Sequence, residues 1–335
     1  MLVSEFDFHL PESSIAQHPL PDRSASRMLV VSRKEERYTD CQFRDLRDFL
    51  QHGDCLALND SKVLPARLYG HREGFSGQIE VLLVKPSGPD PLTWLALARP
   101  GRKLRSGERI LFSPRLSAEI IGRGSNGERI LRFHVDGDLH EAISEVGHTP
   151  LPPYIRRPDT SDDATRYQTV YAASPGSVAA PTAGLHFTPE LLAAFDVPIA
   201  RVTLHTGLGT FQPLQSETVE AVRLHSESYT IAPESVAAIR AASRVVAVGT
   251  TTVRTLETAA SSGWNALCGE TDLFISPGFQ FLCTGAMLTN FHLPQSSLLI
   301  LVCSFGGKDL ILDAYRHAVA AGYRFYSYGD CMLIV

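Results

Sequence analysis

The stretch RVVAVGTTTVRTLETAA, residues 244–260, indicates the fold class of the chain. Residues 244–248 form an apolar run of strand length, which ends at Gly249 in a turn rich in hydroxyl groups. Residues 253–260 then follow a helical pattern. A buried strand that leads through a glycine turn into a helix is typical of α/β proteins, so an α/β core is predicted around this stretch.

The segments on either side extend this pattern. Residues 54–58 form a second apolar run, which leads into Asn59-Asp60-Ser61-Lys62. Further strands are predicted at 28–31 and 298–305, and a helix is predicted at 311–321. Because strands alternate with helices, we expect a mixed-sheet α/β core.

Residues 68–147 have a different pattern of apolar and polar residues. Short apolar runs are separated by Gly, Pro, Ser and Asn without a helical period, as in small antiparallel barrels and sandwiches. We expect an inserted antiparallel β-barrel with strands at 79–84, 94–98, 110–112 and 130–135. The predicted organisation is a first part of the α/β core at 1–67, a β-barrel module at 68–147 and a second part of the core at 148–335.

The composition is that of a globular protein with an acidic balance. The chain has 335 residues and a formal net charge of −5, with 44% hydrophobic and 20% charged residues. This balance argues against capture of nucleic acid by the whole surface, so contact with a polyanion needs a local basic patch. The clearest basic run surrounds Pro100-Gly101 and consists of Arg99, Arg102, Lys103 and Arg105. A solvated loop and a phosphate-binding loop are the two interpretations of this run.

The six cysteines include no C-x-x-C pair, so neither a zinc ribbon nor an iron–sulfur cluster is expected. We expect most of these thiols to be buried as small hydrophobic side chains rather than joined in disulfides. The first residues lack an apolar run of signal-peptide length, and the longest apolar stretch, 298–303, is too short to span a bilayer. A reducing cytoplasm is the expected compartment.

Several stretches rich in Gly, Pro, Thr and His place polar side chains on bent backbone, as sites built on loops require. They are APTAGLHF at 180–187, LHTGLGTF at 204–211, LHSE at 224–227, VGTTTVR at 248–254, TNFHLP at 289–294 and YGD at 328–330. Gly207-x-Gly209 lacks the third glycine and the following helix of a dinucleotide-binding turn, which argues against a standard Rossmann methyltransferase.

The turn at 249–252 lies where a strand feeds a helix. Backbone N–H groups at the start of a helix can hold a carboxylate or a phosphate, and Thr250, Thr251 and Arg254 are candidates for such a contact. An ordinary N-capped helix is the alternative.

Four histidines, His186, His205, His225 and His292, each occur in a different one of these stretches. Together with Glu227 or Asp330 they could ligate a metal, but no H-x-H or H-x-x-x-H spacing is present, so no metal site is predicted. Histidine is equally suited to proton transfer near neutral pH. For any one of them, a satisfied structural hydrogen bond is the alternative.

Taken together, these motifs resemble those of the S-adenosylmethionine:tRNA ribosyltransferase-isomerases of queuosine biosynthesis. The resemblance also includes LPESSIAQHP at 10–19, NDSKVLPAR at 59–67, LPPYI at 151–155, YQTVY at 167–171 and YRFYSYGD at 323–330. Many ordered motifs over nearly the whole chain make this resemblance specific. The departures are small: Thr206 stands where the family usually has Val, Leu224 replaces a usual Met, and Gly306-Gly307 replaces Ala-Gly.

The resemblance implies a two-domain α/β protein with an inserted β-barrel. It implies transfer and isomerisation of the ribosyl part of S-adenosylmethionine onto the aminomethyl group of 7-aminomethyl-7-deazaguanine at the tRNA wobble position. Adenine and methionine are the implied leaving products, and epoxyqueuosine-tRNA is the implied modified RNA. No cofactor is implied beyond S-adenosylmethionine as co-substrate, and the implied partners are the tRNAs for Tyr, His, Asn and Asp.

This chemistry requires a base for C5′ of the donor, an acid for the departing adenine and a neutral amine. We expect the catalytic groups among His186, His205, His225, Glu227, His292 and Asp330. Substrate binding is expected at Thr182, Gly184, Phe187, Gly207, Gly209, Phe211, Thr250, Thr251, Arg254, Asn290 and Phe291. Binding of tRNA is expected at Arg99, Arg102, Lys103 and Arg105.

Two other functions are weighed against this one. An RNA methyltransferase would use the same donor but transfer its methyl group and release S-adenosylhomocysteine. A non-catalytic RNA-binding module would not explain why so many His, Thr and Gly loops lie outside the basic run.

Overall fold

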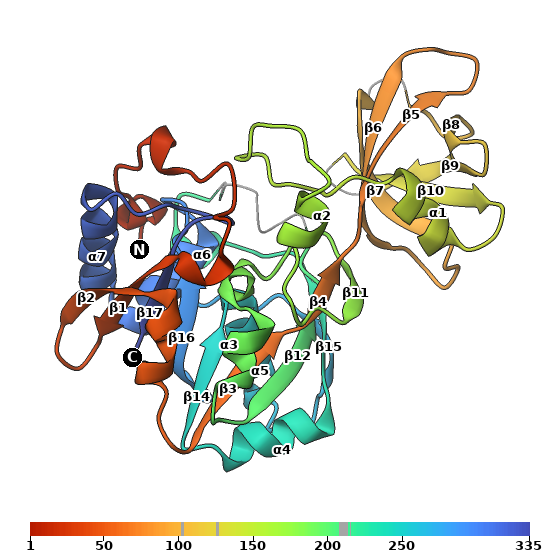
Figure 1. Ribbon diagram of the computed structural model, residues 1–335. Coiled ribbons are helices and arrows are strands. Elements are labelled where there is room, and N and C mark those ends of the chain that lie inside the picture. Colours follow the sequence, from red (N-terminus) through yellow and green to blue (C-terminus); the bar gives the residue numbers. More distant parts are fainter. Residues whose placement is uncertain (102–103, 125–126, 208–213, 215) are drawn as a thin grey trace.

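The computed structural model describes residues 1–101, 104–124, 127–207, 214 and 216–335. In these residues an α/β core and a smaller β-barrel lie side by side and are joined by a narrow connection (Figure 1). The predicted fold class, a mixed-sheet α/β core with an inserted antiparallel β-barrel, is confirmed.

The core is built on a mixed sheet of nine described strands. Their order is β15 (Cys268–Thr271), β13 (Glu227–Ile231), β12 (Ile199–Leu204), β3 (Asp54–Asn59), β14 (Arg244–Val248), β16 (Thr284–Asn290), β17 (Cys331–Ile334), β1 (Arg27–Ser32) and β2 (Arg37–Gln42). The central strands β12, β3, β14 and β16 run parallel, β17 is antiparallel to β16, and β1 is parallel to β17. The strands predicted at 28–31, 54–58 and 244–248 are therefore confirmed.

Both faces of the central strands are buried, because successive side chains of a strand point to opposite faces. In β3, Cys55 and Ala57 belong to one buried cluster with α4 (Pro233–Ala241), α5 (Thr250–Ser261), α6 (Ser297–Gly306) and α7 (Lys308–Ala320). Leu56 and Leu58 belong to the cluster on the other face, with η4 (Phe43–Phe49) and α3 (Pro189–Ala193). This double coverage explains why the strands are continuous apolar runs in the sequence. The helix predicted at 311–321 is confirmed as α7.

The strand predicted at 298–305 is wrong, because these residues form helix α6. The Ser296 side chain accepts a hydrogen bond from the Leu299 N–H and caps the start of the helix, and Gly307, with φ of +88°, ends it. The helix is apolar on all sides because it is buried among other elements of the core. A short apolar run of this kind has no period that separates a buried helix from a buried strand.

The inserted module is a closed barrel in the order β10-β7-β6-β5-β8-β9. Its strands are β5 (Arg67–Arg72), β6 (Gln78–Pro86), β7 (Thr93–Arg99), β8 (Arg109–Ser113), β9 (Leu116–Arg123) and β10 (Arg129–Val135), and α1 (Leu139–Val146) packs on it. The four strands predicted in this segment are confirmed, while β5 and β9 were not predicted. Arg67 and His148 pair through both backbone groups, so the two chain connections of the module lie next to each other.

The remaining elements are short. They are η1 (Val3–Phe6), η2 (Glu12–Ser14), η3 (Arg23–Ala25), β4 (Ser61–Val63), α2 (Asp163–Arg166), β11 (Ser174–Ser177), η6 (Thr182–His186) and η8 (Val219–Ala221). None of the described helices is both long and apolar enough to cross a membrane.

Candidate active site

The carboxyl ends of the four parallel strands meet at one edge of the sheet. β12 is followed by His205 and Thr206, β3 ends at Asn59, β14 is followed by Gly249, and β16 ends at Asn290. The loop motifs found in the sequence therefore converge because of strand direction. In open α/β sheets, ligands bind outside the carboxyl ends of the strands, which makes this edge the candidate site.

A pocket of about 730 Å³, counted with the space open to solvent, lies at this edge. Most of its wall comes from residues 179–183, 249–251 and 289–293. The wall is completed by Tyr154, Thr206, Ser296, Leu298, Tyr326 and Ser327. Of the predicted site, the structure brings together here Thr182, Thr250, Thr251, Asn290, Phe291 and His292.

The start of helix α5 forms one wall of the pocket. Gly249 turns the chain with φ of +91°, a conformation that favours glycine, and no side chain caps the first turn of the helix. Asn59 braces this turn from β3, since its side-chain nitrogen donates to Thr251 Oγ1 at 3.2 Å and to the Leu204 carbonyl at 3.1 Å. The pocket therefore contains a rigid helix N-terminus, which can bind an anionic group.

Two hydroxyl groups of the pocket wall are buried without a hydrogen-bond partner among the described residues. They are Thr206 Oγ1 and the phenol of Tyr326. The Tyr326 backbone has φ of +73°, which is rare for a residue with a side chain, and its ring stacks on Tyr154 with centroids 4.2 Å apart. Buried hydroxyls are normally hydrogen-bonded, so these two groups are suited to contact a ligand.

His186 lies behind the pocket wall and is fully hydrogen-bonded. Its Nε2 is 2.9 Å from Asn290 Oδ1, and its Nδ1 is 2.9 Å from the hydroxyl of Ser26. The Asn290 amide nitrogen donates to the Tyr326 carbonyl, so Asn290 presents its oxygen to His186, and Nε2 carries the proton. Burial lowers the pKa of His186 to about 4. This neutral histidine positions Asn290, which lines the pocket.

The other three histidines lie in different surroundings. His292 lines the pocket, its Nε2 is 2.8 Å from Thr289 Oγ1, and burial lowers its pKa to about 3. His205 is half-buried with an unpartnered Nδ1 among the described residues, and burial lowers its pKa as well. His225 is exposed. Within the described ranges, no group of three His, Cys, Asp or Glu side chains is placed to hold a metal ion.

Three charged residues of the predicted site lie outside the pocket wall. Glu227 and Arg254 form a buried ion pair, in which Arg254 also donates to the carbonyls of Leu273 and Thr271. The second oxygen of Glu227 accepts the N–H of Gly207 at 2.9 Å. The carboxylate of Asp330 accepts the backbone N–H groups of Arg27 and Arg324. These contacts join strands and loops, and they direct the Arg254 side chain to Glu227, Leu273 and Thr271 rather than to the pocket wall.

Of the aromatic residues and glycines predicted to bind substrate, some lie in the packed core and some border the pocket. The ring of Phe187 is buried against Phe43, and that of Phe291 packs against Tyr315 and Phe325, although Phe291 borders the pocket. A Cβ on Gly184 would lie 2.0 Å from the hydroxyl of Tyr171, so close packing accounts for this glycine.

Four predicted residues, Arg102, Lys103, Gly209 and Phe211, lie outside the described residues. Arg99 and Arg105 are exposed on the barrel. Four residues of the site were not predicted individually, although each lies within or next to a motif: Thr206, Asn59, Tyr154 and Tyr326. Their places in or beside the pocket depend on segments that are distant in the sequence, so local sequence does not reveal them.

Comparison with known proteins identifies the family. Residues 3–334 match the family described as queuosine biosynthesis protein. The S-adenosylmethionine:tRNA ribosyltransferase-isomerase of Solibacter usitatus is 59% identical, and that of Thermotoga maritima is 48% identical, each over 100% of both chains. The crystal structure of S-adenosylmethionine tRNA ribosyltransferase from Thermotoga maritima covers 99% of this chain and 100% of its own, with 40% identity and a TM-score of 0.56.

Fold and pocket together define an α/β enzyme whose ligand pocket lies at the carboxyl edge of a mixed sheet. Within that class, the chain belongs to the S-adenosylmethionine:tRNA ribosyltransferase-isomerase family of queuosine biosynthesis proteins.

Proposed function

We propose that the protein transfers the ribosyl part of S-adenosylmethionine to the aminomethyl group of 7-aminomethyl-7-deazaguanine at the wobble position of tRNA. The transferred carbons isomerise to the epoxycyclopentane of epoxyqueuosine, and adenine and methionine leave. The family supports this proposal, and so does one structural observation: the uncapped N-terminus of α5 opens into the pocket at the carboxyl edge of the sheet. We infer no cofactor beyond S-adenosylmethionine and place the reaction, with its tRNA, in the cytoplasm.

The pocket offers complementary groups for the donor. The methionine carboxylate would bind the backbone N–H groups at Thr250 and Thr251, where the helix dipole favours negative charge. The hydroxyls of Thr206 and Tyr326 would bind polar atoms of the ribose or base, because both lack a partner among the described residues. Burial raises the pKa of Tyr326, so its phenol would act as a neutral hydrogen-bond donor.

Abstraction of the proton at C5′ of the donor requires a neutral base near the pocket. His292 in the pocket wall and the half-buried His205, next to Thr206 of that wall, meet this requirement, because burial lowers the pKa of each. His186 has both ring nitrogens hydrogen-bonded and would position Asn290 instead. We therefore propose His292 and His205 as the first candidates for the base, and Arg99 with Arg102, Lys103 and Arg105 as phosphate contacts.

The proposal is tested with purified protein, S-adenosylmethionine and tRNA that carries the aminomethyl base. We expect adenine and methionine in equal amounts, and the mass of epoxyqueuosine in the digested tRNA. The matched control is the same tRNA with guanine at the wobble position, which lacks the accepting amine. The tRNAs for Tyr, His, Asn and Asp should all react, and a tRNA with an unrelated anticodon should not. Release of S-adenosylhomocysteine would instead establish methyl transfer and overturn the proposal.

A further inference from the structure

A second, smaller pocket lies beside the first. Its wall includes Arg23, Arg166 and His186, and it shares Ser327 with the first pocket. The hydrogen bond between His186 and Asn290 joins the walls of the two pockets, since Asn290 lines the first. Arg324 acts electrostatically on His186, as Arg23 does, and both lower its pKa beyond the effect of burial. We call Arg23, Arg166 and Arg324 the arginine cluster.

The charges of the arginine cluster are half-buried, and none of its guanidinium groups forms a direct ion pair among the described residues. Two carboxylates act on the cluster from beyond ion-pair distance: Asp330 interacts electrostatically with Arg324, and Asp22 with Arg166. Arg23 donates to the carbonyls of Leu185 and Thr165, at 3.0 and 2.7 Å. Arg166 donates to the carbonyls of Pro21 and Leu20, and Arg324 to that of His18. No acidic side chain lies within ion-pair distance of any of the three guanidinium groups among the described residues.

Two donors of the arginine cluster have no hydrogen-bond partner. They are Nε of Arg166 and Nη1 of Arg324, and both atoms are buried within the part of the chain that the structure describes. Burial, together with repulsion from Arg166, lowers the pKa of Arg23, and burial lowers that of Arg324 against the opposing effect of Asp330. Desolvated cations without a direct ion pair destabilise a fold, and buried donors are rarely left unpaired. An anionic ligand would satisfy both requirements.

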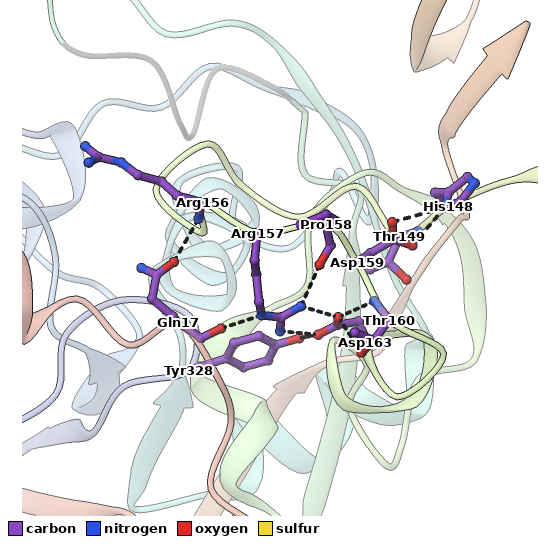
Figure 2. A network of polar contacts seen from close by, with 10 residues as sticks. All are labelled: Gln17, His148, Thr149, Arg156, Arg157, Pro158, Asp159, Thr160, Asp163 and Tyr328. Atoms are coloured by element: carbon purple, nitrogen blue, oxygen red, sulfur yellow. Dashed lines mark hydrogen bonds and ion pairs between the residues drawn. The ribbon is translucent and has the colours of Figure 1, made fainter.

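A network of polar contacts around Arg157, Asp163 and Tyr328 lies beside the smaller pocket (Figure 2). Arg157 forms a bidentate ion pair with the buried carboxylate of Asp163, at 2.7 and 2.9 Å, and Tyr328 donates to the same carboxylate at 2.7 Å. Asp163 is the first residue of helix α2, and Arg166 is the last. Tyr328 belongs to the wall of the smaller pocket. The network therefore fixes the position of Arg166 relative to this wall.

We propose that the arginine cluster binds a backbone phosphate of the tRNA next to the reactive nucleotide. This inference rests on the proposed function. A nucleotide carries its base and its phosphate on one sugar, so two adjoining pockets suit a base in the larger and a phosphate in the smaller. The carboxylate of the donor is the less suitable ligand, because the start of α5 already offers it a site. Guanidinium groups bind phosphate through charge-assisted, paired hydrogen bonds.

The test uses an anticodon stem-loop RNA of a queuosine-type tRNA and three variants, Arg166→Gln, Arg324→Gln and Arg33→Gln. Arg33 is the matched control, because it also donates to backbone carbonyls and is also partly desolvated, but lies at the opposite edge of the sheet. Each cluster variant should weaken RNA binding by about tenfold or more and flatten its salt dependence by about 0.7 in slope. Arg33→Gln should bind RNA as the parent does, and all variants should keep the parent's affinity for S-adenosylmethionine.

A neutral methylphosphonate, placed in turn on each side of the wobble nucleotide, identifies the phosphate. At one position it should weaken binding to the parent about tenfold and cause no further loss with Arg166→Gln or Arg324→Gln. Thermal unfolding checks that each variant is folded, and either cluster variant alone is sufficient for the comparison. Unchanged salt slopes, or methylphosphonate losses that add fully to those of the variants, would overturn the phosphate site. Such a result leaves the proposed reaction intact if modified tRNA still forms, whereas absence of any tRNA reaction in the parent refutes the proposed function itself.

Discussion

Two arrangements of arginine differ in how their charge is balanced. Arg254 is buried and paired with Glu227, and it also donates to two backbone carbonyls, so this charge is neutralised within the fold. The arginine cluster donates only to carbonyls in the described structure and retains two unpaired buried donors. The sequence suggested the opposite assignment, with Arg254 as the ligand contact. Charge balance, rather than proximity to a motif, separates the paired arginine from the arginines that we propose bind a ligand.

The largest expected effect comes from breaking the neutralised pair. Arg254→Met should lower the free energy of unfolding by about 3–5 kcal/mol, because it leaves Glu227 charged, buried and unpaired. Denaturant unfolding measures this change, and Arg240→Met, at an exposed position of α4, is the control. A stable Arg254→Met protein with weakened binding of S-adenosylmethionine would restore Arg254 to the substrate site.

A smaller loss is expected from the network that supports the arginine cluster. Asp163→Asn should lower the free energy of unfolding by about 2–3 kcal/mol at pH 7, since it removes a charged acceptor from Arg157 and Tyr328. Burial opposes ionisation of Asp163, but hydrogen bonds from Arg157, Tyr328 and Thr160 outweigh it and hold the pKa well below the usual value of 3.8.

This depressed pKa sets the sign of the pH dependence. The stabilisation by Asp163 is fully present above the unfolded-state pKa near 3.8 and is lost as the pH falls toward the lower folded-state value. The difference in stability between the parent and Asp163→Asn should therefore be constant from pH 7 to about pH 5 and shrink below about pH 4. Asp162→Asn, at the exposed neighbouring position, should show no such difference. A gap that grows on acidification would contradict the assignment.

The basic run at 99–105 should have a weaker effect than the half-buried arginine cluster, residue for residue, because its described members Arg99 and Arg105 are exposed and exposed charges are screened by salt. Replacement of Arg99, Arg102, Lys103 and Arg105 together by Gln should raise the tRNA dissociation constant by about tenfold. Titrations of tRNA at several salt concentrations measure this effect, and affinity for S-adenosylmethionine should not change. A quadruple variant with the parent's salt slope would place the tRNA surface elsewhere.

The smallest expected effect concerns a neutral group at the helix N-terminus. Thr251→Val keeps the shape of the side chain but removes the hydroxyl that accepts from Asn59 at the pocket wall. We expect affinity for S-adenosylmethionine to fall by a factor that corresponds to about 0.5–1.5 kcal/mol, as for one neutral hydrogen bond. Isothermal titration measures it, with unchanged tRNA affinity as the internal control. If donor affinity is unaffected, the hydrogen bond between Asn59 and Thr251 plays no part in donor binding.

The sequence predicted the parts of the site that depend on local chemistry. Two loops of the site were recognisable by their residues: glycine and threonine follow β14, and asparagine and histidine lie at the end of β16. The two loops lie close together because both strands run in the same direction. The sequence did not predict the pairing of Arg254, because Glu227 is recognisable as a partner only when β13 lies next to β12 and α5 packs behind them. The arginine cluster comes from three distant segments, so no single stretch of sequence shows that its guanidinium groups lack direct ion pairs in the described structure.

The place of β1 in the sheet imposes an order on folding during synthesis. β1 is made well before its parallel neighbour β17, because the other described strands of the sheet and the whole barrel lie between them in the sequence or follow β1 directly. The barrel, in contrast, needs only residues that follow one another closely. During synthesis, then, the barrel can fold while the sheet still lacks a strand, and the edge formed by β1 and β2 cannot join the rest until β17 has been made. A hairpin that stays unpaired over such a length of chain is a segment that chaperones of nascent chains would shield.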